Sequence, residues 1–267
     1  MGAILTINGV PAQADDLRLL VANNYGHFTA LRVEDGKARG LSLHLDRLHG
    51  ATRELFGSEL DRERVRAWLR QAIGDERREL SVRINVFSRR FDRAHPGAAV
   101  APDVLISVAP APAPMHRAPL RLKSFVYGRE LPQVKHVGTF PLFHFRALAQ
   151  RAGFDDALFV DAAGTIAEAS IWNIGLFDGA RIVWPQAPQL DGIGMQLLKL
   201  GLKRHNIASV SRMVRLPQLD EFHAAFLTNS SMSYCPIAAI DGFRFTDVPS
   251  LAELLRRCHE SNPLQPI

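Results

Sequence analysis

Four prolines interrupt the middle of the chain, in the segment APAPAPMHRAP at residues 109–119. Proline has no N–H to donate and its φ is fixed, so this segment cannot continue a central strand or a helix. Such a composition favours an extended, semi-rigid connection. We therefore predict two domains, residues 1–109 and 120–267, joined by a linker at 110–119.

Helical and strand periodicities alternate on both sides of this segment. Apolar residues at 65, 68, 69, 72 and 73 predict an amphipathic helix that Asp61 can cap. Residues 80–87 alternate between apolar and polar side chains, which is typical of a half-buried strand. Asp178-Gly179, between two apolar runs, predicts a hairpin. Hairpins mixed with separate helices indicate the α+β class with largely antiparallel pairing.

Composition excludes several classes of protein. Among the 267 residues, 47% are hydrophobic and 22% charged, as in folded globular chains. Two cysteines, Cys235 and Cys258, can build neither a disulfide framework nor a four-cysteine zinc site. The first residues have no basic and apolar signal pattern, and no uninterrupted apolar run approaches the length of a membrane span. We expect a cytoplasmic protein without membrane association.

The positive charge does not by itself point to nucleic acid. Lysine and arginine exceed acidic residues by 32 to 27, but the arginines between 62 and 93 are interleaved with acidic residues, as on a solvated helix. The sequence has no zinc-finger spacing, RNP-like strand or basic-leucine heptad. His44 and His49 are five residues apart and so do not share a helical face as two zinc ligands would. No nucleic acid and no metal are expected.

Two charged residues in the second half could carry chemistry. Lys135 lies in LPQVKHV among apolar neighbours, where desolvation of the ammonium would favour a nucleophilic amine. Glu168 follows in TIAEASIWN, just past a predicted hairpin strand. Each also has a plain structural interpretation, as an exposed loop lysine and a solvated carboxylate at the end of a strand.

Three further fragments could together bind a phosphate. HLDRL places Arg47 near the start of a helix, LDGIGM places glycines where another helix begins, and TNSSM places two serines after a strand. Taken singly, they are a helix-surface arginine, a glycine turn and a polar turn. Jointly they supply a cation, the free N–H groups of a helix N-terminus and a pair of hydroxyls, which suit a phosphate.

The order of these motifs resembles a known family. HLDRL, LPQVKH, AGFDDALFVDAAGTIAEASIWNI, LDGIGM and FLTNSSMSYCPI follow one another between about residues 25 and 242. This order is similar to that of the class IV aminotransferases, the fold-type IV pyridoxal-phosphate (PLP) enzymes, which include branched-chain and D-amino-acid aminotransferases and aminodeoxychorismate lyase. The resemblance implies a small N-terminal α/β domain and a larger C-terminal domain with a mainly antiparallel sheet or barrel.

The resemblance also implies roles for individual residues. Lys135 would form the Schiff base with PLP, and Glu168 would pair with the pyridine nitrogen. Asn173 would brace the loop that carries Glu168. The phosphate would be held by Arg47, the backbone amides of Ile193 and Gly194, and Ser230. Ser231 would help to fix the cofactor or a substrate carboxylate through its N–H.

A substrate carboxylate needs a further cation. Arg83, on the polar face of the predicted strand at 80–87, is the first candidate, with Arg32 and Arg129 after it. A salt bridge between domains is the alternative interpretation of Arg83.

The sequence departs from the family at two places. Thr139-Phe140 stands where branched-chain members place a tyrosine, which does not favour branched-chain specificity. Met195 stands where an arginine is frequent in the family.

The resulting hypothesis is a PLP-dependent aminotransferase that moves an amino group between an amino acid and a 2-oxo acid. Two alternatives stay open: a lyase that releases pyruvate from an aminodeoxychorismate-like substrate, and an inactive relative that only binds. The resemblance further implies a homodimer.

Overall fold

The computed structural model describes residues 4–76, 78–112, 118–246 and 248–267. Its contacts divide the chain into two compact units. The first unit comprises Met1–Pro114, Val134–Gly138 and Pro263–Ile267, and the second comprises Met115–Gln133 and Thr139–Asn262.

This division differs from the predicted one, with its boundary at 110–119. Val134–Gly138 and Pro263–Ile267 join the first unit because their backbones pair with its strands. Pro110 lies opposite Leu80 at the end of a strand, where the sequence placed the start of the linker. Residues 113–117 of the predicted linker lie outside the described part of the chain.

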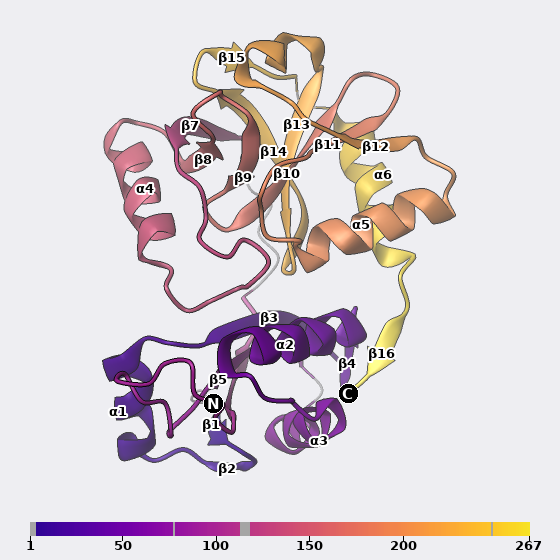
Figure 1. Cartoon of the computed structure of the whole chain (residues 1–267). Coiled ribbons are helices and arrows are strands. Elements are labelled where there is room, and N and C mark those ends of the chain that lie inside the picture. The colour runs from indigo at the N-terminus through magenta and orange to yellow at the C-terminus, as the bar shows by residue number, and fades with distance from the viewer. Residues whose placement is uncertain (1–3, 77, 113–117, 247) are drawn as a thin grey trace. The chain divides into compact units, whose positions relative to one another are not determined.

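The described residues of the first unit form a seven-stranded antiparallel sheet in the order β16-β4-β3-β5-β6-β1-β2. Figure 1 shows β16, in yellow, beside β4. The strands are β1 (Ile4–Ile7), β2 (Val10–Pro11), β3 (His27–Glu34), β4 (Lys37–Arg39), β5 (Leu80–Phe87), β6 (Asp103–Pro110) and β16 (Leu264–Pro266).

Three helices complete the first unit: α1 (Ala14–Asn23), α2 (Leu41–Phe56) and α3 (Arg62–Ile73). The predicted helix at 65–73 is α3, whose N-cap Asp61 accepts a hydrogen bond from the N–H of Arg64 at 3.1 Å. Apolar residues of α2 and α3 pack with those of β3, β5 and β6 into one core, and Ile267 belongs to it. Helices α2 and α3 therefore cover one face of the sheet and hold β3 and β5, which matter for the site, whereas α1 packs against Phe87 and Leu105 in a separate core.

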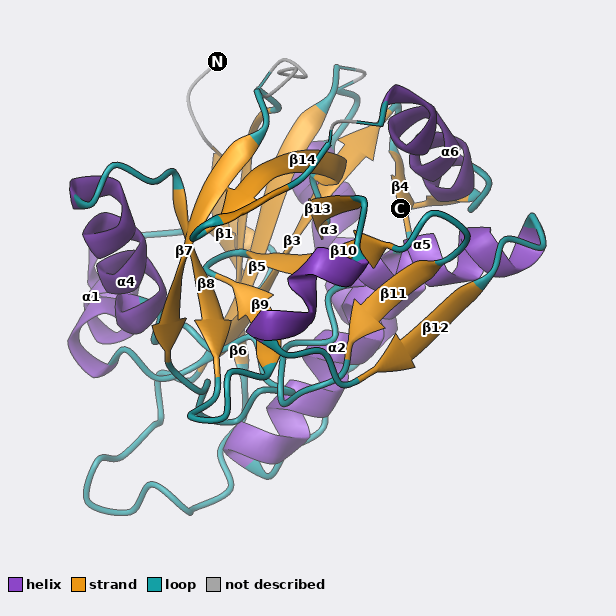
Figure 2. Cartoon of the chain, turned by 90° about the horizontal axis from the view of Figure 1, so that it is seen from above, coloured by secondary structure: helices purple, strands orange, loops and turns teal. Residues whose placement is uncertain are grey.

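The second unit is built on a closed barrel of β7 (Leu120–Val126), β8 (Asp156–Val160), β9 (Ile166–Ala169), β10 (Trp172–Phe177), β13 (Ala224–Asn229) and β14 (Met232–Ile240). Pairing of β9 with β10 closes the ring (Figure 2). Most neighbours are antiparallel, whereas β7 runs parallel to β8 and to β14. The barrel is extended by β11 (Ile182–Pro185) and β12 (Ser209–Arg212), and β15 (Phe243–Arg244) pairs with β14. The predicted hairpin at Asp178-Gly179 joins β10 to β11.

Helices α4 (Phe140–Arg151), α5 (Ile193–Arg204) and α6 (Pro249–Glu260) pack around this barrel, and a 3₁₀ turn covers Leu216–Glu221. Met195 and Leu198 of α5 share a core with Leu255 of α6 and Phe226 of β13. The predicted α+β class, with a mainly antiparallel barrel in the C-terminal part, is confirmed. Within the described ranges, no helix is both long and apolar enough to cross a membrane.

Candidate active site

The backbone of Lys135 is fixed against β3. The N–H of Phe28 donates to the carbonyl of Lys135 at 2.9 Å, and the N–H of Val137 donates to the carbonyl of Gly26 at the same distance. Val134, beside it, is only 1% exposed and anchors the segment in the first unit. The Lys135 residue itself is half-buried. Lys135, which the sequence alone could place in an exposed loop, therefore has a fixed backbone position and is half-buried.

The aromatic ring of Phe28 contacts two of the predicted site residues. Lys135 Nζ lies 4.8 Å from the ring centroid, and the guanidinium carbon of Arg83 lies 3.5 Å from it. Arg83 Nε also donates to Asn85 Oδ1 at 3.0 Å. Both cations are therefore held by one ring through cation–π attraction. Sequence reasoning missed Phe28 and Asn85, since nothing in their local pattern marks them.

The three arginine candidates for a substrate carboxylate differ in their partners. Arg32 is paired with Glu79, and Arg129 with Glu168. Arg83 is exposed, and none of the carboxylates in the described part of the chain pairs with it. Arg83 is therefore the one of the three with its charge available to a ligand.

Arg47 lies on α2, one turn after His44. His44 is 2% exposed, and its Nδ1 lies 2.7 Å from Thr29 Oγ1. Burial, helped by the positive charges of Arg47 and Lys135, lowers the pKa of His44 from 6.5 to about 3. The neutral imidazole thus packs near two cations of the first unit without adding a third charge.

Glu168 lies on β9 of the second unit and forms a buried ion pair. Arg129 Nε is 2.8 Å from Glu168 Oε1, and each side chain is 5% exposed. A carboxylate this deep stays ionised only with a close counter-charge and hydrogen bonds. Arg129 supplies both, so the buried Glu168 carboxylate has a counter-charge in direct contact.

The N-terminus of α5 lies against the turn that follows β13. A Cβ at Gly194 would overlap the backbone carbonyl of Asn229, so only glycine permits this approach. Gly192, the N-cap, has no side chain to accept from the first-turn N–H groups of α5. Ser230 is half-buried and Ser231 is exposed in the adjoining turn. The predicted phosphate residues of the second unit are thus brought together by tertiary packing.

This arrangement fits a phosphate. The amides of Ile193 and Gly194 sit at the positive end of the helix dipole, where anions are favoured. The N–H of Ser231, proposed to contact a ligand, donates to Asn229 Oδ1 at 2.9 Å in this structure. Its role toward a ligand stays a prediction.

Asn173 contacts a second segment besides the one that carries Glu168. It pairs in register with Glu168 across β9 and β10, but its side chain reaches toward α5. Its Nδ2 donates to the carbonyl of Leu190 at 2.8 Å and to Gln189 Oε1 at 3.1 Å. Asn173 thus braces the segment that leads into α5.

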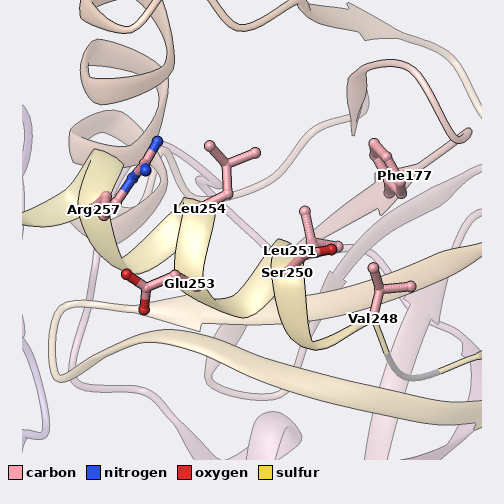
Figure 3. A pocket seen from close by; sticks show the side chains of 7 residues that line it. All are labelled: Phe177, Val248, Ser250, Leu251, Glu253, Leu254 and Arg257. Atoms are coloured by element: carbon pink, nitrogen blue, oxygen red, sulfur yellow. The ribbon is translucent and has the colours of Figure 1, made fainter.

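A pocket of about 400 Å³ beside α6 contains none of the predicted residues (Figure 3). Its walls are mainly apolar, and its one carboxylate, Glu253, is paired with Arg256 at 2.7 Å. It offers no nucleophile or base of the predicted kind. In the described ranges, no group of three or more His, Cys, Asp or Glu residues is placed to hold a metal ion.

Solved structures similar to this chain are aminotransferases. A hypothetical aminotransferase from Mycobacterium tuberculosis, in its PLP-bound form, has a TM-score of 0.81 at 22% identity, covering 97% of this chain and 100% of that chain. The branched-chain aminotransferase of Thermoproteus uzoniensis with norvaline has a TM-score of 0.85 at 16% identity, covering 99% of both chains. That of Escherichia coli has a TM-score of 0.83 at 16% identity, covering 96% of this chain and 92% of that chain.

At these identities the structures establish the fold. The comparison with curated proteins gave no match. A family model described as class IV amino-transferase matches residues 26–240, from the end of the turn before β3 to the last residue of β14. The match takes in the strand that seats Lys135, the strand of Glu168 and the start of α5. The class of enzyme predicted from the motifs is confirmed, and the chain belongs to the class IV aminotransferase family.

Proposed function

We propose that this enzyme uses PLP, held covalently by Lys135, to move an amino group between an amino acid and a 2-oxo acid. The observation that carries the proposal is the seat of Lys135, whose backbone is tied to β3 and whose ammonium lies over Phe28. An amine held in place gains reactivity mainly from orientation. The family match and the PLP-bound relative support the choice of cofactor.

Glu168 holds the proton on the pyridine nitrogen. When bound, PLP supplies an electron sink for the negative charge that develops at the substrate α-carbon. An ionised carboxylate is needed at the ring nitrogen for that purpose, and the buried Arg129 keeps Glu168 in this form.

The phosphate is held by the side chains and backbone amides that the motifs predict. Arg47 supplies the cation, Ile193 and Gly194 supply backbone N–H groups, and Ser230 supplies a hydroxyl. Support comes from the open first turn of α5 and from its packing against Asn229.

The substrate is held and deprotonated by residues of the first unit. Arg83 binds a substrate carboxylate, since its charge has no carboxylate partner among the described residues. The free amine of Lys135 would take the proton from the substrate α-carbon as a general base and give that proton up again as a general acid to complete the transfer. Ser231 adds a contact to cofactor or substrate.

Borohydride reduction followed by peptide mapping tests the role of Lys135. The label is expected on Lys135, and Lys135→Ala should keep the fold but abolish turnover. A label on another side chain, or on none, would overturn the proposal.

A panel of amino and 2-oxo acids, beside an aminodeoxychorismate-like substrate, then tests the reaction. Amino exchange in the panel is expected, with no pyruvate released from the aminodeoxychorismate-like substrate. Pyruvate released from that substrate without amino exchange would make the enzyme a lyase. Absence of both reactions would identify a protein that only binds.

We further propose that the enzyme is a cytoplasmic homodimer. Cys235 and Cys258 are buried as thiols, with no disulfide between them, which suits a reducing compartment. Light scattering at the mass of two chains would support the dimer, and a single-chain mass would exclude it.

A further inference from the structure

Three residues of neighbouring strands form one row across the barrel of the second unit. Asn173 on β10 lies opposite Glu168 on β9 and opposite Thr228 on β13. Side chains that are directly opposite in antiparallel strands share a face. With strands about 4.8 Å apart, the row spans roughly 10 Å from Glu168 to Thr228. It joins the proposed ring-nitrogen partner to the strand that leads into the Ser230 turn.

The central side chain of this row is tied to the entry of α5. Asn173 is 4% exposed, and its amide donates to the carbonyl of Leu190 and to Gln189. Gln189 in turn donates to the carbonyl of Pro185 at the end of β11, at 2.7 Å. A buried amide with satisfied donors has one orientation, so this short network is stiff.

The Asn173 side chain also lies close to Gly192, where a Cβ would have no room. A Cβ at Gly192 would overlap Asn173 Oδ1, although the φ of −68° at Gly192 would suit any residue. Glycine at the N-cap of α5 is therefore required by the neighbouring amide, not by backbone conformation.

We propose that Asn173 is a positioning residue that sets the distance between the phosphate-binding N-terminus of α5 and the Glu168 carboxylate. The inference rests on the proposed function, since it takes the first turn of α5 as the phosphate site. Without the Asn173 amide, the segment before α5 loses its tie to β10, and the first-turn N–H groups move away from the place where a phosphate needs them.

The chain contains a matched control. Asn262 is 2% exposed, and its Nδ2 donates to the carbonyl of Leu197, farther along α5, at 2.9 Å. Asn173→Ala and Asn262→Ala each remove a buried amide that donates to backbone carbonyls. Of the two, only Asn173 contacts the segment before α5. Both variants should therefore lose stability, but only Asn173→Ala should lose affinity for an anion.

The test measures binding to the apoprotein by calorimetry, with inorganic phosphate, PLP and pyridoxal as probes. Asn173→Ala is expected to weaken the binding of phosphate and of PLP about tenfold, which corresponds to the loss of one hydrogen bond to the phosphate. The affinity for pyridoxal, which has no phosphate, should stay within about twofold of wild type. Asn262→Ala should leave all three unchanged. Equal effects of both variants, or an equal loss for pyridoxal, would overturn the inference.

Gly192→Ala keeps the test valid if Asn173→Ala folds poorly, because its methyl group would displace the Asn173 amide. It should weaken phosphate binding by itself, and unchanged affinity would overturn the inference. Where Asn173→Ala does fold, Gly192→Ala should weaken phosphate binding much less in that background, because the space is free. Additive effects would count against the contact. Failure of the wild type to attach PLP at Lys135 would refute the proposed function, whereas the phosphate titration of the apoprotein would still report on Asn173.

Discussion

Glu168 and Arg129 bury opposite charges side by side, each 5% exposed. Taking two charges out of water is costly, and breaking such a pair leaves the remaining charge without its main compensation. The pair is therefore explained better by the need for an ionised carboxylate at this place than by stability. Arg129, a candidate for the substrate in the sequence, is committed instead to Glu168.

Replacement of Arg129 by methionine should destabilise the enzyme by about 3–5 kcal/mol, because Glu168 loses its buried counter-charge. Adding Glu168→Gln should recover much of this loss. Urea unfolding of the single and double variants measures both effects. Arg32→Met is the control, since its partner Glu79 is half exposed and such pairs contribute only about 0–1 kcal/mol. Equal effects at the two arginines would contradict this account.

Two buried histidines of the first unit make its stability depend on pH. Burial lowers the pKa of His27 from 6.5 to about 3, and burial with two nearby cations does the same for His44. Between these values the unfolded chain binds more protons than the folded one. The contribution of these neutral histidines to the free energy of unfolding is fully present above pH 6.5. It decreases as the pH falls and is lost near pH 3.

Acidification from pH 7 to pH 5 should therefore lower the free energy of unfolding by about 2 kcal/mol for each of these histidines. His44→Gln should make the dependence on pH shallower by that amount. His205→Gln, at an exposed site on the second unit, should leave it unchanged. Urea midpoints at the two pH values give the comparison, and an unchanged slope in His44→Gln would rule out this source.

At the scale of elements, the N-terminus of α5 has its place because two glycines let it approach its neighbours. Gly192 lies against the Asn173 amide, and Gly194 lies against the Asn229 backbone. Amides at a helix start are open in any helix. In this chain, the contacts of α5 with β10 and with the turn after β13 also fix the direction of these amides.

Gly194→Ala should weaken binding of inorganic phosphate to the apoprotein. The added methyl group must displace the backbone of Asn229, and overpacking of this kind typically costs about 1–3 kcal/mol. Gly50→Ala on α2 is the matched control, since nothing lies within 4 Å of its Cβ position. That change should be neutral or stabilising in thermal unfolding. Unaltered phosphate affinity in Gly194→Ala would place the anion elsewhere.

At the scale of the whole molecule, neither unit is a single stretch of sequence. β16 pairs with β4, and Ile267 enters the core beneath it. The segment 134–138, which carries Lys135, adds its backbone to β3. The chain thus returns twice to the first unit after leaving it.

A fragment of residues 1–109, the first domain as predicted from the sequence, should therefore be less stable than the same region in the full chain. It lacks β16, one of the two strands that pair with β4, and the segment 134–138, which pairs with the start of β3. Hydrogen exchange of the amides in Lys37–Arg39 should be fast in the fragment and slow in the full chain. Equal protection in both would show that the later segments are dispensable.

Local patterns predicted what depends on neighbours in sequence. The α3 stripe, the β5 alternation and the Asp178-Gly179 hairpin follow from periodicity and turn chemistry, and all three are present. The choice among Arg32, Arg83 and Arg129 does not, because it depends on which carboxylate each one meets. The contacts of Phe28 and Asn85 were likewise invisible, since the Phe28 ring meets Arg83 and Lys135 only through tertiary packing.

By itself, the sequence determined the motifs, their order and hence the family, because nucleophile, carboxylate and phosphate motifs are short stretches whose chemistry is local. Tertiary structure decided which unit carries Lys135, which of the three arginines has no carboxylate partner among the described residues, and which segment Asn173 supports. Each of these depends on a close approach between residues distant along the chain. Backbone pairing and burial fix such approaches only when the whole sheet has formed.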